Sequence, residues 1–531
     1  MICLSGVKII DPANHIDGDI GDLWIEGDRI VAAPPAQDGA EMIDARGWIA
    51  APGGIEIHSH IAGAQMAMAR KFAVREDRMD AGLLLPPAQI AQAYLKMGYT
   101  TVFDAAMSPM LSRLTQDDLK AMRGLDCGAY TLVSEQICVV DAIKKQDDQA
   151  LKSALAWLLT RSGGYALKLV NPGVGLAWWM GKLLSSLDDA LDGDRLTQRR
   201  IILAIAQAAK ELSLPHPIHL HAGNLGRPGS WQSFCETVLA LEGLPAHLCH
   251  IQFYCYGKDD RGRSCSAAEQ VVETIAMRDN LTFDVGQIVF GPAMALTCDL
   301  QLVEWLHRVG SGKWTCRLLE GEGGMGLLPL EYKIKDPSSA VQWATGLELL
   351  LRFPDPTRLF LSTDYPNGGP FIAYPRIISW LMDGEARQKM LAQVHPSAKL
   401  RTSLADIDRQ YTLTEVVQMT SAGPARALGL QDRGHLGAGA LADIRCYQPQ
   451  SDIENMFANP ILVIKRGQVV LRDGQLKLPS SGNHLSVEPD WDKDREVIFK
   501  EQLQTNTTID PRYLGWLERG FHENREVIPC R

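Results

Sequence analysis

The sequence predicts an α/β protein in which a (β/α)8 barrel is joined to a small β-sandwich domain built from both chain ends. Two observations support this prediction. The middle of the chain alternates short apolar strand patterns with helical patterns, as barrels of parallel strands do. Both ends are instead rich in short strands and turns. We expect β-domain segments at 1–50 and 431–480, the barrel at 51–430 and a C-terminal extension at 481–531.

The two ends of the chain have similar sequence patterns. Residues 7–12 and 22–31 have strand composition, and the Glu-Gly-Asp stretch inside the second of them is a hairpin signal. Similar strand pairs return at 439–444 and 463–470, so we expect both ends to pack together. The extension at 481–531 is charged and polar, which is typical of a surface extension or subunit contact, or of a loose tail.

Eight strand candidates fill the middle of the chain, with helical segments at 87–96, 149–159 and 197–212 between them. Pro87 suits a helix start, because the N–H that proline lacks would find no partner there. The connection before the last strand is long and contains a glycine-rich stretch at 321–326, which is typical of a functional loop such as a lid. The strand candidates are 55–61, 100–104, 129–134, 165–170, 217–222, 246–252, 281–286 and 358–364.

Composition and charge exclude several classes of protein. The 531 residues are 46% hydrophobic and 22% charged, as in ordinary globular proteins, and the net charge of −10 argues against nucleic-acid binding. We find no apolar run of the roughly 18 residues that a membrane span needs, and no signal peptide. The 11 cysteines form no Cys-x-x-Cys pair, which argues against an iron–sulfur cluster and fits reduced thiols in a cytoplasmic protein.

Potential metal ligands recur at the ends of the strand candidates. His58 and His60 are two residues apart, so on one strand both side chains point to the same face. Strand ends form the active-site rim of a barrel, and imidazole suits zinc and similar metals. The series is similar to the ligand order of binuclear amidohydrolases, and it predicts metal-assisted hydrolysis of a C–N bond. In chain order its members are His58, His60, Lys168, His221, His250 and Asp364.

Two positions of this series, and His219 beside it, allow alternative interpretations. Lys168 lies in a buried strand, where desolvation favours a neutral amine that can form a carbamate with CO2 and bridge two cations; otherwise its ammonium reaches water at a strand edge. Asp364 either caps a turn or binds metal and takes the proton of the attacking water. His219 shares a strand face with His221, either as a donor that orients the site or as a packed core histidine.

Four stretches resemble the A subunits of formylmethanofuran dehydrogenase and of the formyltransferase/hydrolase complex of methylotrophic bacteria, within the amidohydrolase superfamily. They include His-Ser-His-Ile-Ala-Gly at 58–63 and Asp-Tyr-Pro-Asn-Gly-Gly-Pro at 364–370, and the similarity extends to about residue 480. The other two stretches are 168–173 and 219–226.

This resemblance implies a cytoplasmic two-zinc hydrolase of one-carbon metabolism, which interconverts N-formylmethanofuran or a methylofuran analogue with formate and the free amine. It implies partner subunits of a complex, whereas the net charge and the apolar runs argue against a nucleic-acid or a membrane partner. His219 and Asn171 are the residues that we expect to contact the formyl carrier. The implied metal ligands are His58 and His60 on one zinc, His221 and His250 on the other, carboxylated Lys168 as the bridge, and Asp364 as ligand and proton shuttle.

Two other functions stay open at this point. A different cyclic-amide amidohydrolase, such as a hydantoinase or dihydroorotase, would need a cationic residue for its carboxylate-bearing substrate. A catalytically silent scaffold protein would assemble partners and would have no need of the ligand set.

Overall fold

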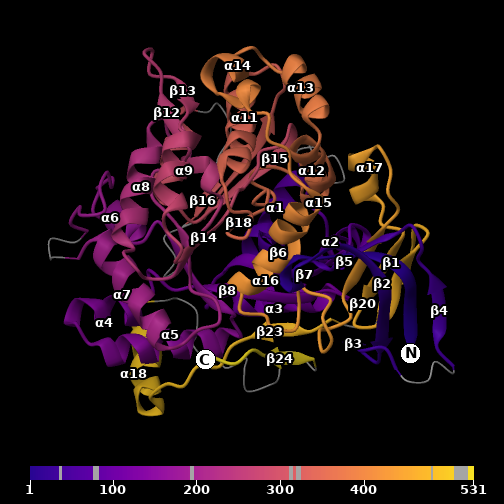
Figure 1. The fold of residues 1–531 in the computed structure, drawn as a ribbon. Coiled ribbons are helices and arrows are strands. Elements are labelled where there is room, and N and C mark those ends of the chain that lie inside the picture. The colour runs from indigo at the N-terminus through magenta and orange to yellow at the C-terminus, as the bar shows by residue number, and fades with distance from the viewer. Residues whose placement is uncertain are drawn as a thin grey trace.

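A ring of parallel strands surrounded by helices forms the centre of the molecule, and a second sheet lies beside it (Figure 1). The structure is a computed structural model. It describes residues 1–34, 39–75, 83–191, 196–309, 315–317, 325–479, 482–506 and 524–531.

All eight predicted barrel strands are present and pair in parallel, each with its neighbour along the series. The ring is nearly closed, since the His60 amide donates a 2.8 Å hydrogen bond to the Tyr365 carbonyl, linking the end of the first strand to the residues after the last. This confirms the predicted barrel. The strands are β6 (Gly54–Ser59), β7 (Tyr99–Met107), β8 (Asp126–Leu132), β9 (Ala166–Val170), β10 (Ile218–His221), β11 (Ala246–Leu248), β14 (Leu281–Asp284) and β18 (Leu359–Phe360).

Several strands end earlier than the sequence predicts. The sixth stops at Leu248 and the eighth at Phe360, although their apolar patterns continue to 252 and 364. The backbone turns at these ends, where His250 has a φ of 41° and Asp364 a φ of 48°. This left-handed conformation is incompatible with a strand, so both side chains are carried by turns rather than by the strands themselves.

The three predicted helices are confirmed as α2 (Pro87–Lys96), α5 (Asp148–Ser162) and α7 (Gln198–Glu211). The side chain of Asp147 accepts the amide of Ala150 at the start of α5, and Thr197 caps α7 in the same way. The other helices around the barrel are α1 (Gly63–Arg75), α3 (Ser112–Ala121), α4 (Ile137–Lys145), α6 (Val174–Trp179), α8 (Ser230–Ala240), α9 (Ala268–Ala276), α12 (Tyr374–Met382), α13 (Gly384–Gln393), α14 (Ser397–Arg401), α15 (Leu413–Val417) and α16 (Gly423–Ala427).

The long connection predicted between the last two barrel strands is present between β14 and β18 as a folded insertion, and its described residues form strands and helices. Its strands pair in the order β15-β17-β16. The glycine-rich stretch lies outside the described residues at 321–324, and Met325 and Gly326 belong to β17. The elements are β15 (Gly291–Thr297), α10 (Leu300–Val309), β16 (Thr315–Arg317), β17 (Met325–Tyr332) and α11 (Pro337–Arg352); a hairpin of β12 (Tyr256–Lys258) and β13 (Ser264–Ser266) precedes them.

The two chain ends meet in one nine-stranded sheet, as predicted. The joining pair is β5 with β19, antiparallel from Pro52 opposite Ile444 to Ile49 opposite Tyr447. The boundaries at 50, 430 and 480 stay a prediction. The strands are β1 (Ile2–Asp11), β2 (Ile16–Glu26), β3 (Arg29–Val31), β4 (Glu41–Asp44), β5 (Ile49–Pro52), β19 (Ile444–Tyr447), β20 (Leu462–Lys465), β21 (Gln468–Arg472) and β22 (Gln475–Leu476); α17 (Ile453–Ala458) lies between β19 and β20.

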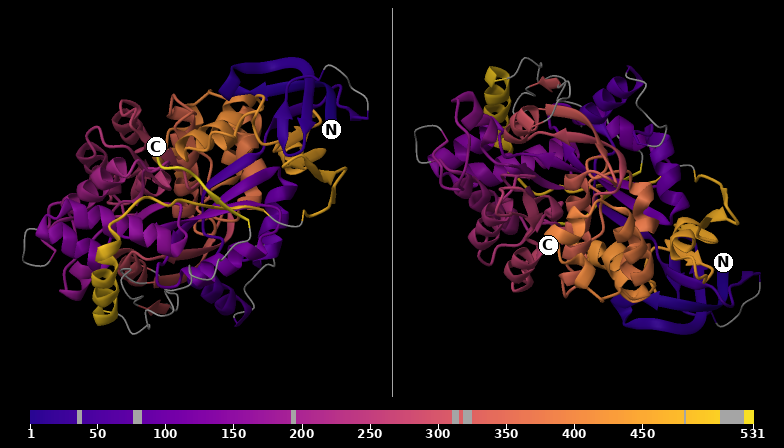
Figure 2. Two further views of the ribbon diagram at one scale, coloured as in Figure 1. Left: turned by 90° about the horizontal axis from the view of Figure 1, so that it is seen from below. Right: turned by 90° about the horizontal axis from the view of Figure 1, so that it is seen from above.

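The C-terminal extension is part of the barrel base, so the alternative of a loose tail is wrong for its described residues. Strand β23 (His484–Ser486) pairs in parallel with the start of β8 and with β24 (Arg525–Val527), and Leu485 and Val487 are fully buried. Helix α18 (Glu496–Asn506) packs Phe499 against Trp157 of α5, with ring centroids 5.4 Å apart. Seen from below, the yellow C-terminal segment crosses the barrel strands (Figure 2, left).

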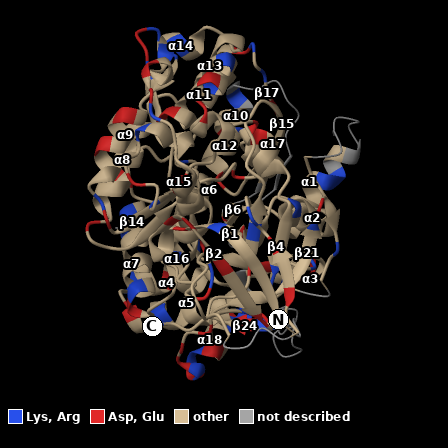
Figure 3. Cartoon of the chain, turned by 45° about the vertical axis from the view of Figure 1, so that its right-hand side comes forward, with Lys and Arg blue, Asp and Glu red and all other residues tan. Residues whose placement is uncertain are grey.

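Acidic and basic residues are interspersed along the chain in the view of Figure 3. Among the helices of the described residues, none combines the length and the apolar character that crossing a bilayer requires.

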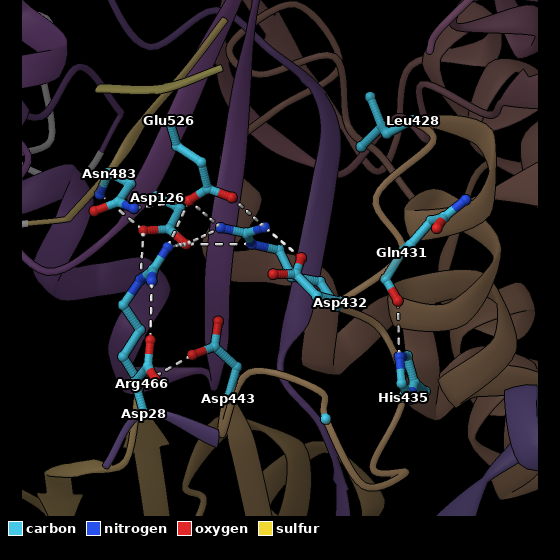
Figure 4. Close-up of polar contacts among 12 residues, drawn as sticks. Asp28, Asp126, Leu428, Gln431, Asp432, His435, Asp443, Arg466, Asn483 and Glu526 are labelled. Carbon is cyan, nitrogen blue, oxygen red and sulfur yellow. Dashed lines mark hydrogen bonds and ion pairs between the residues drawn. The ribbon is translucent and has the colours of Figure 1, made fainter. Parts of the chain in front are cut away.

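A buried group of charges ties the barrel base to the second sheet and to the extension (Figure 4). Asp126, at the start of β8, accepts hydrogen bonds from Lys465 and Arg433, both at 2.9 Å. Arg433 and Arg466 also bind Glu526 of β24, at 2.8 and 2.7 Å. Burial opposes ionisation of Asp126, yet these three cations hold its pKa below the ordinary value.

We predict that Arg433→Met destabilises the protein by roughly 3–5 kcal/mol, because it removes a buried cation from a network in which Asp126 and Glu526 both depend on it. Urea unfolding followed by tryptophan fluorescence measures the loss. Arg46→Met is the matched control, since Arg46 and its partner Asp44 are 80% and 63% exposed and their pair contributes little. Similar losses in the two variants would contradict a structural role for the buried network.

Candidate metal centre

The six predicted ligands converge at the carboxyl ends of the barrel strands. Each comes from the end of β6, β9, β10, β11 or β18, or from the turn that follows. They surround one cavity of about 460 Å³. His60, Lys168, His221, His250 and Asp364 line it. His58 lies behind them, with none of its surface exposed.

The first subset of ligands gathers on one carboxylate. Asp364 Oδ1 lies 3.0 Å from His58 Nε2 and 3.3 Å from His60 Nε2. Each residue offers one donor atom, and all three atoms lie within 4.8 Å of one another. Burial raises the pKa of Asp364, and the hydrogen bond with His60 opposes this shift. Two nitrogens and an oxygen facing one point are a donor set that suits zinc.

The second subset is His221 and His250, whose ring centroids lie 4.8 Å apart. His221 Nε2 and His250 Nδ1 are buried and have no hydrogen-bond partner among the described residues. His221 Nε2 does lie 3.5 Å from Asp299 Oδ2, which is within ion-pair distance but without hydrogen-bond geometry. Buried polar atoms without partners are costly, and a bound metal would satisfy both nitrogens.

Lys168 lies between these subsets and is only 2% exposed. Its Nζ lies 3.1 Å from Cys249 Sγ. In the part of the chain that the structure describes, no carboxylate lies within ion-pair distance of this amine. The amine therefore lies beside the ligands without a counter-ion, where a carbamate formed on it would face both subsets.

Cys249 is a site residue that sequence patterns did not reveal. Its thiol lies 3.2 Å from His250 Nε2 and donates to the Leu220 carbonyl at 3.2 Å. Burial raises the pKa of this thiol to about 12. The cysteines show no pattern along the chain, so only the position of Cys249, directly before a ligand, could have drawn attention to it.

Asp284, at the end of β14, is a second residue of this kind. Its Oδ1 accepts the backbone amide of His250 at 3.0 Å and the hydroxyl of Ser362, which holds the turn that carries His250. Its Oδ2 lies 3.1 Å from His247 Nε2 and 3.4 Å from His58 Nδ1. A carboxylate at the end of the seventh strand candidate, where other strands carry ligands, was the available signal.

Glu56, two residues before His58 on β6, holds the backbone of this ligand. Its Oε1 accepts the His58 amide at 3.1 Å, and its Oε2 accepts the hydroxyl groups of Tyr374 and Tyr94. Burial raises its pKa to about 8, although these hydrogen bonds oppose the shift.

His219 and Asn171, the residues expected to contact a formyl carrier, do not line the cavity. His219 is fully buried behind His58, with its Nε2 2.8 Å from His58 Nδ1. The backbone amide of Asn171 donates to the His221 carbonyl at 2.8 Å, and its side-chain oxygen accepts Gln198 Nε2 at 2.6 Å. Both residues lie next to ligands, and their contact with a carrier stays a prediction.

The folded insertion forms an apolar wall opposite the ligands. Strands β15 and β17 contribute Leu296, Leu328 and Leu330, and α10 contributes Leu302. Phe253 completes this wall from the barrel side. A mostly apolar cavity with a few convergent polar groups is typical of a small-molecule site.

Comparisons with known proteins agree with this geometry. A sequence model described as "Amidohydrolase family" matches residues 41–471. The chain is 36% identical to the A component of the formyltransferase/hydrolase complex Fhc of Methylorubrum extorquens, over 99% of both chains. It is also 36% identical to "Protein FwdA" of Methanocaldococcus jannaschii, over 90% of this chain and 89% of that protein.

Solved structures of related proteins also match this chain. The formyltransferase/hydrolase complex of Methylorubrum extorquens, solved with methylofuran, contains a chain that matches over 100% of both chains, with a TM-score of 0.94 at 34% identity. A D-aminoacylase matches 91% of this chain and 99% of its own, with a TM-score of 0.51 at 14% identity, which shows a shared fold alone.

We predict that stability of the metal-free protein falls between pH 4.5 and about 8 because of Glu56, whose carboxyl keeps its proton to about pH 8 in the folded state and loses it near pH 4.5 when unfolded. The unfolded state then binds fewer protons, so the free energy of unfolding falls by up to roughly 1.4 kcal/mol per pH unit from this group. Urea unfolding at several pH values measures it. Glu56→Gln has no proton to release and should show a flatter profile; parallel profiles would contradict a protonated Glu56.

Proposed function

Because the chain belongs to the amidohydrolase family, we propose that it hydrolyses the C–N bond of a formamide as one member of a formyltransferase/hydrolase complex. The observation that carries this proposal is the convergence of the six predicted ligands, five of which line one cavity while His58 lies directly behind them. The 36% identity to the A component of the Fhc complex, over 99% of both chains, supports the substrate class and the assembly with other subunits.

We propose that the site holds two zinc ions, and the donor chemistry fits them. His58 and His60 would hold one ion with Asp364. The other would be held by His221 Nε2 and His250 Nδ1, which are buried and make no hydrogen bond among the described residues. Lys168, as a carbamate, would supply two oxygens between them. Bound zinc would polarise the formyl oxygen and lower the pKa of a water molecule towards about 7.

Asp364 is the group that would move the proton. In the hydrolysis, the oxygen of water bonds to the formyl carbon and the C–N bond breaks, giving formate and the free amine. Asp364 would take a proton from the water and give it to the leaving nitrogen. Burial raises the pKa of this carboxyl, which brings it nearer to neutrality and favours its use as both base and acid.

The apolar wall would exclude bulk water and take the ring that carries the formamide. The related Methylorubrum complex was solved with methylofuran, so we propose N-formylmethanofuran or a methylofuran analogue as the substrate. Zinc content together with formate release from formylmethanofuran, both measured on the purified complex, tests the proposal. A complex that contains zinc and releases no formate would contradict the substrate.

We predict that Asp364→Asn keeps most of the fold and loses turnover by roughly 10²–10⁴-fold, because an amide cannot accept the proton of water. Melting temperature and rate are measured on the same preparation. The matched control is Asp355→Asn, since Asp355 accepts the Thr357 amide in a turn far from the ligands. The control should lower the melting temperature alone. If Asp364→Asn behaves like the control, Asp364 is a turn-capping residue and not catalytic.

We predict that Lys168→Ala loses most of the bound zinc, and that short carboxylates with added zinc restore part of the activity. Elemental analysis and rate measurements test this. Lys465→Ala is the control, because Lys465 is equally buried, at 2% exposure, but pairs with Asp126 at the opposite end of the barrel. It should lower stability and keep zinc. Normal zinc content and rate in Lys168→Ala would refute the carbamate.

A further inference from the structure

A line of three histidines leads from His58 away from the cavity. His58 Nδ1 lies 2.8 Å from His219 Nε2, and His219 Nδ1 lies 3.1 Å from His216 Nε2. His216 Nδ1 ends the line 2.7 Å from the carbonyl oxygen of Ala427, the last residue of α16. We propose that His216 is a positioning residue, which acts through His219 to fix the tautomer of His58 and so directs its Nε2 lone pair towards a metal. This inference rests on the proposed function.

The carbonyl of Ala427 sets the direction of the line. A carbonyl oxygen can only accept, so His216 Nδ1 must carry the hydrogen. A neutral imidazole carries one hydrogen, which leaves His216 Nε2 as an acceptor for His219 Nδ1–H. By the same reasoning His219 Nε2 accepts from His58 Nδ1–H. His58 Nε2 is then left with its lone pair, which faces another acceptor, Asp364 Oδ1, at 3.0 Å. A cation held between these two atoms would satisfy both, whereas the reversed line would have His58 Nε2 donate to Asp364.

Burial keeps the three rings neutral, as this reasoning requires. His58, His216 and His219 each have no exposed surface. Taking a charge out of water is costly, so each buried ring carries one hydrogen and donates through one nitrogen.

Asp284 supports the same direction independently. Its Oδ2 lies 3.4 Å from His58 Nδ1, while its Oδ1 accepts two hydrogen bonds, from His250 and Ser362. The reversed line would turn the lone pair of His58 Nδ1 towards this carboxylate and that of His216 Nδ1 towards the Ala427 carbonyl. Acceptors would then face acceptors at both ends.

Neighbouring rings pack against the histidines and support the ring orientations on which the direction of the line depends. The Tyr130 ring lies against His216 and His219, with centroids 5.4 and 4.4 Å away. His247 lies against the other face of the line, 4.5 Å from His219. Tyr130 is itself fixed, because its hydroxyl donates to the Ile57 carbonyl at 2.7 Å.

Two substitutions at His216 separate its hydrogen-bonding role from its packing role. The amide of Gln reaches the position of the histidine Nε2, so His216→Gln keeps an acceptor for His219. The shorter Asn reaches only the position of Nδ1, so His216→Asn keeps a donor to the Ala427 carbonyl and loses the hydrogen bond with His219. Loss of the partner that orients a ligating histidine costs about 10- to 100-fold in metal affinity.

The test is the zinc dissociation constant of the purified complex, measured by competition with a chelator, for wild type and both variants. We expect His216→Asn to bind zinc about 10- to 100-fold more weakly and His216→Gln to stay within a few-fold of wild type. The visible spectrum of the cobalt-substituted complex should change in His216→Asn alone. Equal affinities in all three proteins, or equal losses in both variants, would overturn the inference.

Neutron diffraction of the wild-type complex tests the direction without any variant. We expect deuterium on Nδ1 of His216 and of His219; deuterium on Nε2 of either residue would overturn the inference even if the variants fail to fold. A wild-type complex with no affinity for zinc would instead contradict the proposed function and this inference together. Normal zinc binding with the opposite direction would contradict this inference alone.

Discussion

Exclusion of water from the ligand cluster is the constraint on which the rest of the structure depends. His58 and Asp284 are completely buried, and Asp364 is 4% exposed. Polar groups in such a place are stable only when each has a partner, because water cannot replace a lost hydrogen bond. The barrel interior therefore contains buried hydrogen bonds to carboxylates. The backbone amide of His58 donates to Glu56, and that of His250 donates to Asp284. Among the described ligands, the nitrogens without partners are those of His221 and His250 beside the cavity.

The two ends of the barrel have different roles. Ligands lie at the carboxyl ends of the strands, whereas the charges around Asp126 lie at the opposite end. This division is general in barrels of this kind, where one face carries chemistry and the other stability. Here the stabilising face recruits Lys465 from the second sheet and Glu526 from the C-terminal extension. Three segments far apart in the sequence thus hold the base on which the ligand strands stand.

Much of the fold and of the ligand set could be predicted because the signals are local. Apolar runs mark the strands, and His58, Lys168 and Asp364 lie at or just beyond their ends. Partners could not be predicted in the same way. The hydrogen bond from His216 to Ala427 joins residues 211 positions apart, and nothing in the sequence near either residue indicates it.

The strands inside the insertion and the extension escape prediction for a related reason. Strand β17 begins within a glycine-rich stretch that resembles a loop and pairs with β15, and β23 is a three-residue strand in a polar segment. Both are strands because of the partners that they find. Propensity is weak in short segments, and tertiary pairing decides their structure.

The pairing of β5 with β19 has a consequence for how the chain folds during synthesis. Strand β5 ends at Pro52, and β19 begins at Ile444. At roughly 5–20 residues per second, β5 leaves the ribosome on the order of half a minute before its partner exists. An unpaired strand edge is a template for pairing with other chains. The nascent N-terminal sheet is therefore at risk of aggregation early in synthesis. Chaperone protection during translation would matter more for this protein than for a barrel protein whose domains are contiguous in sequence.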